Sequence, residues 1–177
     1  MGICLRRLLI AFSGFMLLAC INNIMNLHHQ TALAAGYGNL EISNQYIRVF
    51  VNRSGDATGR FAVDSTGGDP LNPWDDNKPL IYGRPRPWTS YTTVRVDGVD
   101  YVFGGKTETR AGRHALYGTQ VSEPKIIGGS SIASTWKFGD IEVSQILSIV
   151  RSTTTGLLDT AKITYVATNL GDTGHTV

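Results

Sequence analysis

The stretch between residues 131 and 168 constrains the fold most, because it predicts three β-strands in succession. Residues 131–138 alternate between apolar and polar side chains and end at Gly139-Asp140, where the glycine tolerates the positive φ of a tight hairpin turn. Residues 141–151 and 161–168 form two further runs, and the second alternates most regularly. A three-stranded meander with one apolar face needs a second layer to cover it. The sequence therefore predicts an all-β fold, an antiparallel β-sandwich.

The rest of the chain fits the same class. Beyond residue 35 no segment keeps the 3.6-residue apolar period of a helix over ten residues, and turn signals recur every eight to twelve residues. The clearest hairpin lies within residues 91–103, where β-rich runs flank Asp97-Gly98, a dipeptide that suits a turn with two positive φ angles. Further strands are predicted at residues 39–42, 46–52, 60–64, 80–83 and 117–127. Residues 35–177 are expected to form one domain.

The first 34 residues have the pattern of an export signal. Arg6 and Arg7 precede an apolar run at 8–21 that is too short for a comfortable membrane span. Ala-Leu-Ala at 32–34 is a small-x-small cleavage site that would start the mature chain at Ala35. Leu-Leu-Ala-Cys at 17–20 is an alternative, since it is similar to the lipobox of bacterial lipoproteins and would place a lipid on Cys20. We expect a secreted or cell-surface protein with signal 1–34, with the lipoprotein and an uncleaved anchor as alternatives.

The charge balance limits the possible partners, and the cysteine positions exclude an internal disulfide in the exported part. Residues 1–34 hold two of the 16 basic residues and none of the 14 acidic ones, so the remainder has no net formal charge. The charge balance therefore gives no support for nucleic acid or an anionic membrane as partner, and no membrane contact is expected beyond the signal or a lipid anchor. Both cysteines, Cys4 and Cys20, also lie in the signal, so the exported part has no internal disulfide.

Aromatic residues and arginines gather in one part of the chain and suggest a glycan site. Aromatic faces stack on sugar rings, and arginine can hydrogen-bond hydroxyls or carboxylates. An ordinary structural role, in which some of these rings cap the open end of the sandwich, is the simpler alternative. The candidate ligand-binding residues are Trp74, Tyr82, Arg84, Arg86, Trp88 and Tyr91.

Residues 69–77, here named the acidic loop, are dense in carboxylates and side-chain amides. Asp69, Asp75 and Asp76 could ligate Ca²⁺, which prefers oxygen ligands, although their spacing does not match an EF-hand. Asx residues beside prolines are also typical of ordinary turns. No other cofactor is expected, and a plain turn is the default for this loop.

The chain shows no catalytic motif. His114 and His175 are the only histidines outside the signal, and neither an H-E-x-x-H helix nor a G-x-S-x-G elbow is present. Carboxylates such as Asp64 and Glu108 could in principle supply a glycosidase pair, but sequence spacing cannot place two of them at the needed separation. The sequence therefore leaves enzymatic activity open, and we prefer a non-catalytic protein.

Several stretches resemble the N-terminal region of large exported bacterial surface proteins of uncharacterised function. They are residues 59–61, 65–70, 75–80, 89–98 and 165–175. The layout is similar to the supersandwich of galactose-mutarotase-like and polysaccharide-processing proteins. This resemblance implies the fold and the location, and it implies that the natural chain continues past Val177 into further strands and domains. It transfers no catalytic residue.

These observations lead to one preferred function and two alternatives. We expect a secreted or surface β-sandwich module, structural or glycan-contacting, whose partner is a cell-wall or extracellular polysaccharide. The first alternative is the accessory N-terminal domain of a carbohydrate-active enzyme, and the second is a Ca²⁺-stabilised adhesion module. His175 looks like the start of a strand, which we expect beside the free edge of residues 161–168.

Overall fold

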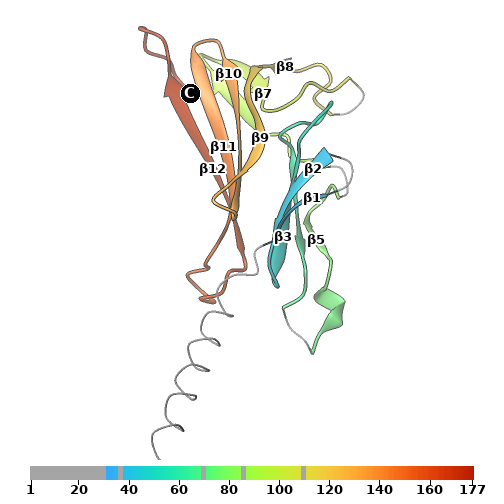
Figure 1. Ribbon diagram of the computed structural model, residues 1–177. Coiled ribbons are helices and arrows are strands. Elements are labelled where there is room, and N and C mark those ends of the chain that lie inside the picture. The colour runs from blue at the N-terminus through green and yellow to red at the C-terminus, as the bar shows by residue number, and fades with distance from the viewer. Residues whose placement is uncertain (1–30, 36–37, 69–70, 85–86, 109–110) are drawn as a thin grey trace, which may run out of the picture.

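The structure is a computed structural model that describes residues 31–35, 38–68, 71–84, 87–108 and 111–177. The described residues form three sheets, mostly antiparallel, and no α-helix (Figure 1). The predicted all-β fold is confirmed. No helix in these ranges is long and apolar enough to cross a membrane.

The first sheet has five antiparallel strands whose order in space follows the chain. They are β1 (Thr31–Ala35), β2 (Asn39–Ser43), β3 (Ile47–Asn52), β4 (Phe61–Ser65) and β5 (Pro79–Ile81). A single 3₁₀ turn, η2 (Pro73–Asp75), lies in the connection between β4 and β5. β1 includes the predicted cleavage sequence and pairs in register with β2, so a mature chain starting at Ala35 would lack most of this strand.

The second sheet contains the predicted meander, in the order β12-β11-β10-β9. Its strands are β9 (Thr119–Ile127), β10 (Ser131–Phe138), β11 (Ile141–Val150) and β12 (Thr160–Asn169). Gly139 takes the positive φ of 60° that the turn between β10 and β11 was expected to need. Buried and half-buried residues alternate without a break along β10 and β11, which confirms the predicted faces.

The third sheet is small and has three strands, β6 (Thr93–Val96), β7 (Val99–Val102) and β8 (Leu116–Tyr117). The predicted hairpin between β6 and β7 is present, with φ of 49° at Asp97 and 82° at Gly98. β8 pairs parallel to β7. Local patterns did not indicate this pairing, because the two strands are separated by a loop and β8 has only two residues.

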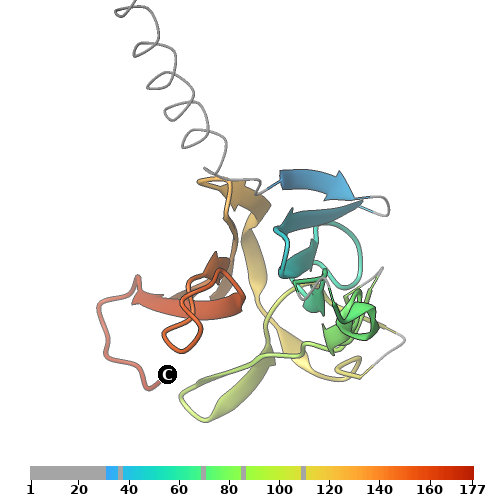
Figure 2. The same ribbon diagram turned by 90° about the horizontal axis from the view of Figure 1, so that it is seen from below.

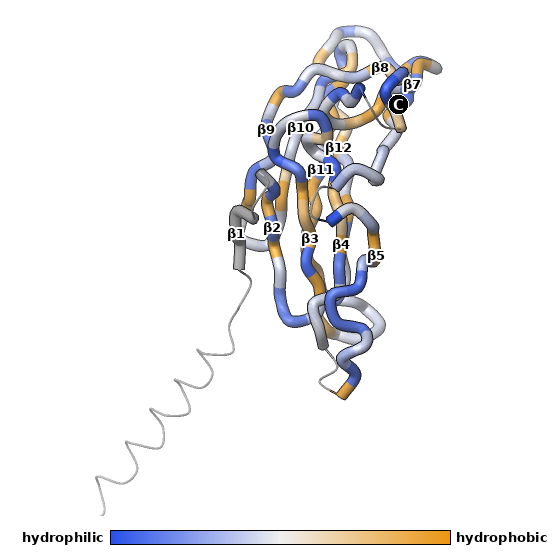
Figure 3. Tube along the Cα trace, turned by 90° about the vertical axis from the view of Figure 1, so that its right-hand side faces the viewer, coloured by the Kyte–Doolittle hydropathy of each residue, from blue (hydrophilic) through white to orange (hydrophobic). Residues whose placement is uncertain are grey.

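Two apolar clusters hold the sheets together. The larger lies between the five-stranded and four-stranded sheets and contains Leu40, Ile42, Ile47, Val49, Val51, Phe61, Val63, Ile132, Leu147 and Ile149. The smaller joins the three-stranded sheet to the meander and contains Val94, Val96, Phe103, Trp136, Phe138, Ile141 and Val143. Figure 3 shows apolar segments (orange) concentrated along the strands. Full burial of one such side chain contributes about 1.5–3 kcal/mol, so these clusters dominate the stability.

The C-terminal segment does not form the strand that was expected to begin at His175. Residues 174–177 have no regular structure and reach the β6–β7 turn instead. Asp97 N donates to Thr176 O over 3.0 Å, and Asp97 Oδ1 accepts from Thr176 N over 2.9 Å. His175 Nδ1 lies 2.7 Å from Asp97 Oδ2. These contacts direct the segment to the third sheet, away from β12.

Candidate functional site

The face of the five-stranded sheet that points away from the core carries two buried charges. Phe61 and Val63 on β4 point into the larger apolar cluster. Because side chains alternate along a strand, Asp64 and the preceding Arg60 lie on the opposite face. Both are only 1% exposed. A loop must therefore cover this face, since an uncovered sheet would leave both charges in water.

The covering segment is residues 82–91, here named the aromatic loop, of which Pro85 and Arg86 lie outside the described residues. Its backbone is tied to β4 where Phe61 N donates a hydrogen bond of 2.7 Å to Ser90 Oγ. Thr89 Oγ1 donates to Tyr82 O, which draws the two ends of the loop together. These contacts hold the loop on the sheet face.

Arg84 in this loop forms an ion pair with the buried Asp64. Arg84 Nε lies 3.0 Å from Asp64 Oδ2, but neither carboxylate oxygen accepts a well-aligned hydrogen bond from a described residue. We regard the contact as an ion pair without hydrogen-bond alignment, because charge attraction depends on distance far more than on angle. Burial raises the pKa of Asp64 above its ordinary value of 3.8, and the charges of Arg84 and Arg48 oppose that rise.

Arg60 is held by neutral groups. Its Nη1 donates to Phe103 O over 3.2 Å and its Nη2 to Gly105 O over 3.1 Å. The guanidinium also lies over the ring of Tyr91, 4.3 Å from the centroid, in a cation–π contact. No carboxylate among the described residues forms an ion pair with Arg60. It therefore ties β4 to the segment after β7 and to the aromatic loop.

Tyr82 and Trp88 form the outward-facing part of the aromatic loop. Their rings meet edge to face, with centroids 6.2 Å apart and planes at 84°. Tyr82 is 62% exposed, whereas Trp88 is half-buried. The edge of one ring against the face of the other fixes the orientation of an exposed aromatic surface.

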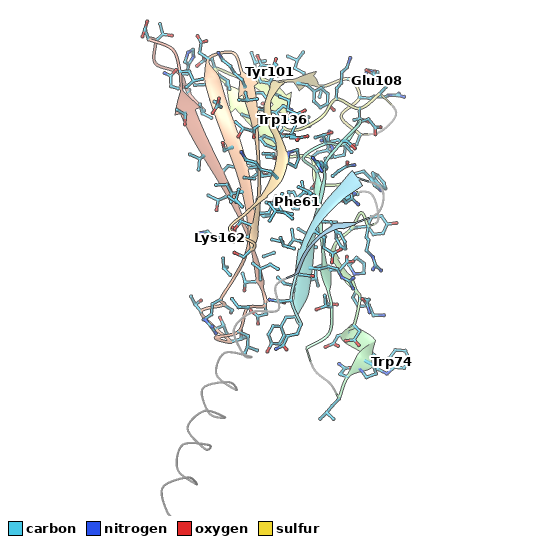
Figure 4. All side chains as sticks on the ribbon, viewed as in Figure 1. Phe61, Trp74, Tyr101, Glu108, Trp136 and Lys162 are labelled. Carbon is cyan, nitrogen blue, oxygen red and sulfur yellow. The ribbon has the colours of Figure 1, made fainter. Side chains whose placement is uncertain are left out.

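The structure brings together four of the six predicted ligand-binding residues and separates one. The aromatic loop contains Tyr82, Arg84, Trp88 and Tyr91. Trp74 projects from η2 at the lower end of the molecule and is 83% exposed (Figure 4). Arg86 lies outside the described residues. Two rings make contacts within the protein, since Tyr91 stacks on Arg60 and Trp88 packs against Tyr82.

Sequence reasoning missed the roles of Arg60 and Asp64. The sequence did contain an indication of these roles, because each is a charged residue beside or within the apolar run of β4. Charged residues in a strand usually face solvent, so the pattern alone did not indicate that a loop covers them.

The acidic loop is closed by turn hydrogen bonds. Asn72 caps η2 by accepting from Trp74 N over 3.3 Å, and Ser65 Oγ donates to Asp75 O. Asp69 lies outside the described residues, and Asp75 and Asp76 have no third metal-binding side chain grouped with them in the described part of the chain. A plain turn stays the prediction for this loop, with calcium binding as the untested alternative.

One chain of polar groups has the connectivity of a catalytic triad. Thr173 Oγ1 lies 3.3 Å from His175 Nε2, and His175 Nδ1 lies 2.7 Å from Asp97 Oδ2. The carboxylate of a working triad is buried, whereas the side chain of Asp97 is half exposed, and the Thr–His contact is long. The hydrogen bond from His175 lowers the pKa of Asp97, followed in effect by that from Thr176 N. We interpret the arrangement as the anchor of the C-terminal segment.

Comparison with known proteins adds no further identification. No family model matches the chain, no curated protein is significantly similar to it, and no solved structure matches its fold. The resemblance to exported bacterial surface proteins therefore stays a prediction, and the functional argument depends on the site alone.

Proposed function

We propose that this protein is an exported, non-catalytic β-sandwich module that contacts a cell-wall or extracellular polysaccharide through the aromatic loop. The observation that carries the proposal is the exposed ring of Tyr82, two residues from the ion-paired Arg84 on an anchored loop. An exposed aromatic face held in one orientation suits a sugar ring, because little side-chain entropy is lost on binding.

Arg84 supplies the polar part of this contact. A guanidinium has five N–H donors; Nε of Arg84 lies 3.0 Å from Asp64 Oδ2, and the Arg84 side chain is 43% exposed. The remaining donors can reach sugar hydroxyls or a uronate carboxylate next to the ring stacked on Tyr82. The ion pair with the buried Asp64 also restrains the arginine, so the loop offers a pre-formed surface.

Binding to purified polysaccharides tests the proposal. The protein, as its host processes it, is titrated with neutral and acidic soluble glycans and assayed for pull-down by insoluble cell walls. We expect Tyr82→Ala to weaken binding about tenfold, since loss of a good aromatic contact costs about 1.4 kcal/mol. Trp74→Ala is the matched control, because it removes an even more exposed ring that lies apart from the loop.

Two results would count against this function. One is the absence of binding to every glycan class tested. The other is an equal loss of affinity in Tyr82→Ala and Trp74→Ala, which would indicate non-specific adsorption to exposed aromatic residues.

A further inference from the structure

β12 forms one edge of the four-stranded sheet and has a partner on one side only. It pairs with β11 over its full length, from Thr160 opposite Val150 to Asn169 opposite Ile141. No described strand pairs with its other edge. Figures 1 and 2 show β12 (red) at the outside of the molecule, with the C-terminal segment leaving from its end. Alternate residues along this ten-residue strand therefore present unpaired backbone N–H and C=O groups that are available for strand addition.

The inward face of β12 is also incompletely covered. Ile163 lies directly opposite Leu147 and points to the same side of the sheet, yet Ile163 is 38% exposed and Leu147 is 1% exposed. Tyr165 is exposed to a similar degree, although its hydroxyl donates to Gln145 Oε1 over 3.0 Å and contacts Thr92 Oγ1. The other two sheets thus cover β11 fully and β12 only in part.

β12 lacks the features by which proteins protect exposed edges. It has no proline, no glycine and one charge, Lys162, and its register with β11 is unbroken. The opposite edge strand β9 contains Pro124 between Glu123 and Lys125, and its pairing with β10 has two register shifts. β5 is also protected, since it has three residues and begins with a proline. β12 is the longest edge strand of the described structure, and it carries none of these protective features.

We propose that β12 pairs antiparallel with β12 of a second copy of this chain, about a two-fold axis that passes midway between the two copies of Tyr165. Directly opposite residues in a sheet share a face, and a two-fold axis perpendicular to the sheet preserves the faces. Centring the pair on Tyr165 satisfies this condition and places Ile163 opposite Ala167 of the second copy. The two four-stranded sheets then form one continuous sheet, and the partly covered apolar residues extend across the join.

The charges of β12 and β11 suit this pairing. Lys162 comes opposite Thr168 of the second copy, and Thr168 pairs with Glu142 on the next strand. Lys162 and the second copy's Glu142 thus lie two strand spacings apart, about 10 Å between backbones, which two extended side chains can span. The two lysines lie six residues apart along the pair, about 20 Å, so they do not repel one another strongly.

Sedimentation over a concentration range tests the proposal. A single strand pair buries less than the roughly 1,200 Å² of a standard interface, so we expect a reversible dimer that forms between about 1 and 100 μM. Ile163→Lys and Val166→Lys each place a charge on one face of the edge and should shift the dimerisation midpoint at least tenfold. Val121→Lys on β9 is the matched control, since Val121 is 51% exposed on the other edge of the same sheet, close to the 47% of Val166, and it should leave the midpoint unchanged.

Hydrogen exchange locates the interface independently of any substitution. Backbone amides of β12 should exchange more slowly at high protein concentration, whereas those of β9 should be unaffected.

Thermal melts show whether each variant remains folded. Val166→Lys, on the outward face, keeps the test valid if Ile163→Lys does not fold. A monomer at every concentration, or a dimer with protection elsewhere, would overturn the proposal.

Discussion

The ion pair beneath the aromatic loop gives the sharpest test of the site. Arg84→Ala removes the closest cation from Asp64 and leaves its carboxylate buried. Loss of one partner of a fully buried pair costs about 3–5 kcal/mol. Arg84 is 43% exposed and Arg48 remains nearby, so solvent screening reduces the expected loss to about 2 kcal/mol. In a domain of this size that loss lowers the melting temperature by about 4–8 °C.

The stability lost in Arg84→Ala should increase as the pH rises. The pKa of Asp64 is raised above 3.8 by burial, so between 3.8 and its folded value the folded protein holds a proton that the unfolded chain has released. Stability therefore falls as the pH rises through that window. Removal of Arg84 raises the folded pKa further and widens the window. The stability difference between the variant and the unmodified protein should thus be largest near pH 7 and should shrink as the pH falls.

Urea unfolding from pH 7 down to pH 4 measures this difference. Asp64→Asn combined with Arg84→Ala should recover part of the loss, because the uncompensated charge is gone, and a double-mutant cycle gives the coupling. Arg95→Ala is the matched control: its pair with Asp100 is well aligned but exposed and screened by solvent, so its loss should cost much less stability than Arg84→Ala. The reasoning would be refuted if Arg84→Ala lost no more stability than Arg95→Ala, or if the stability lost in Arg84→Ala did not change with pH.

Three further predictions concern the core, the N-terminus and the acidic loop. Gly59→Ala should cost at least about 2 kcal/mol more than Gly55→Ala in urea unfolding, since both have positive φ but only at Gly59 does the added carbon lie 2.8 Å from the Trp136 ring; equal losses would contradict this packing. N-terminal sequencing of exported protein should begin at Ala35, as the cleavage pattern predicts, whereas a lipid-modified Cys20 would reverse that reading and keep β1 in the mature chain. Millimolar Ca²⁺ should leave the melting temperature unchanged; a rise would show that the acidic loop binds the ion.

Local sequence patterns predicted most of the strands because a strand and its turn involve neighbouring residues. The faces of β10 and β11 follow from alternation, and the turns at Gly139 and at Asp97-Gly98 follow from backbone preferences. The candidate site was predicted in part for the same reason, since four of its residues lie in one short loop.

What the sequence by itself determined is which side chains share a face, and only the tertiary structure decided what covers each face. Arg60 and Asp64 look like solvent-facing charges in the sequence, and they are buried because a loop twenty residues later folds over β4. Ile163 looks like a core residue, and it stays partly exposed because neither of the other sheets extends over β12. The physical reason is that alternation is a property of one strand, whereas burial depends on contacts between segments far apart in the chain.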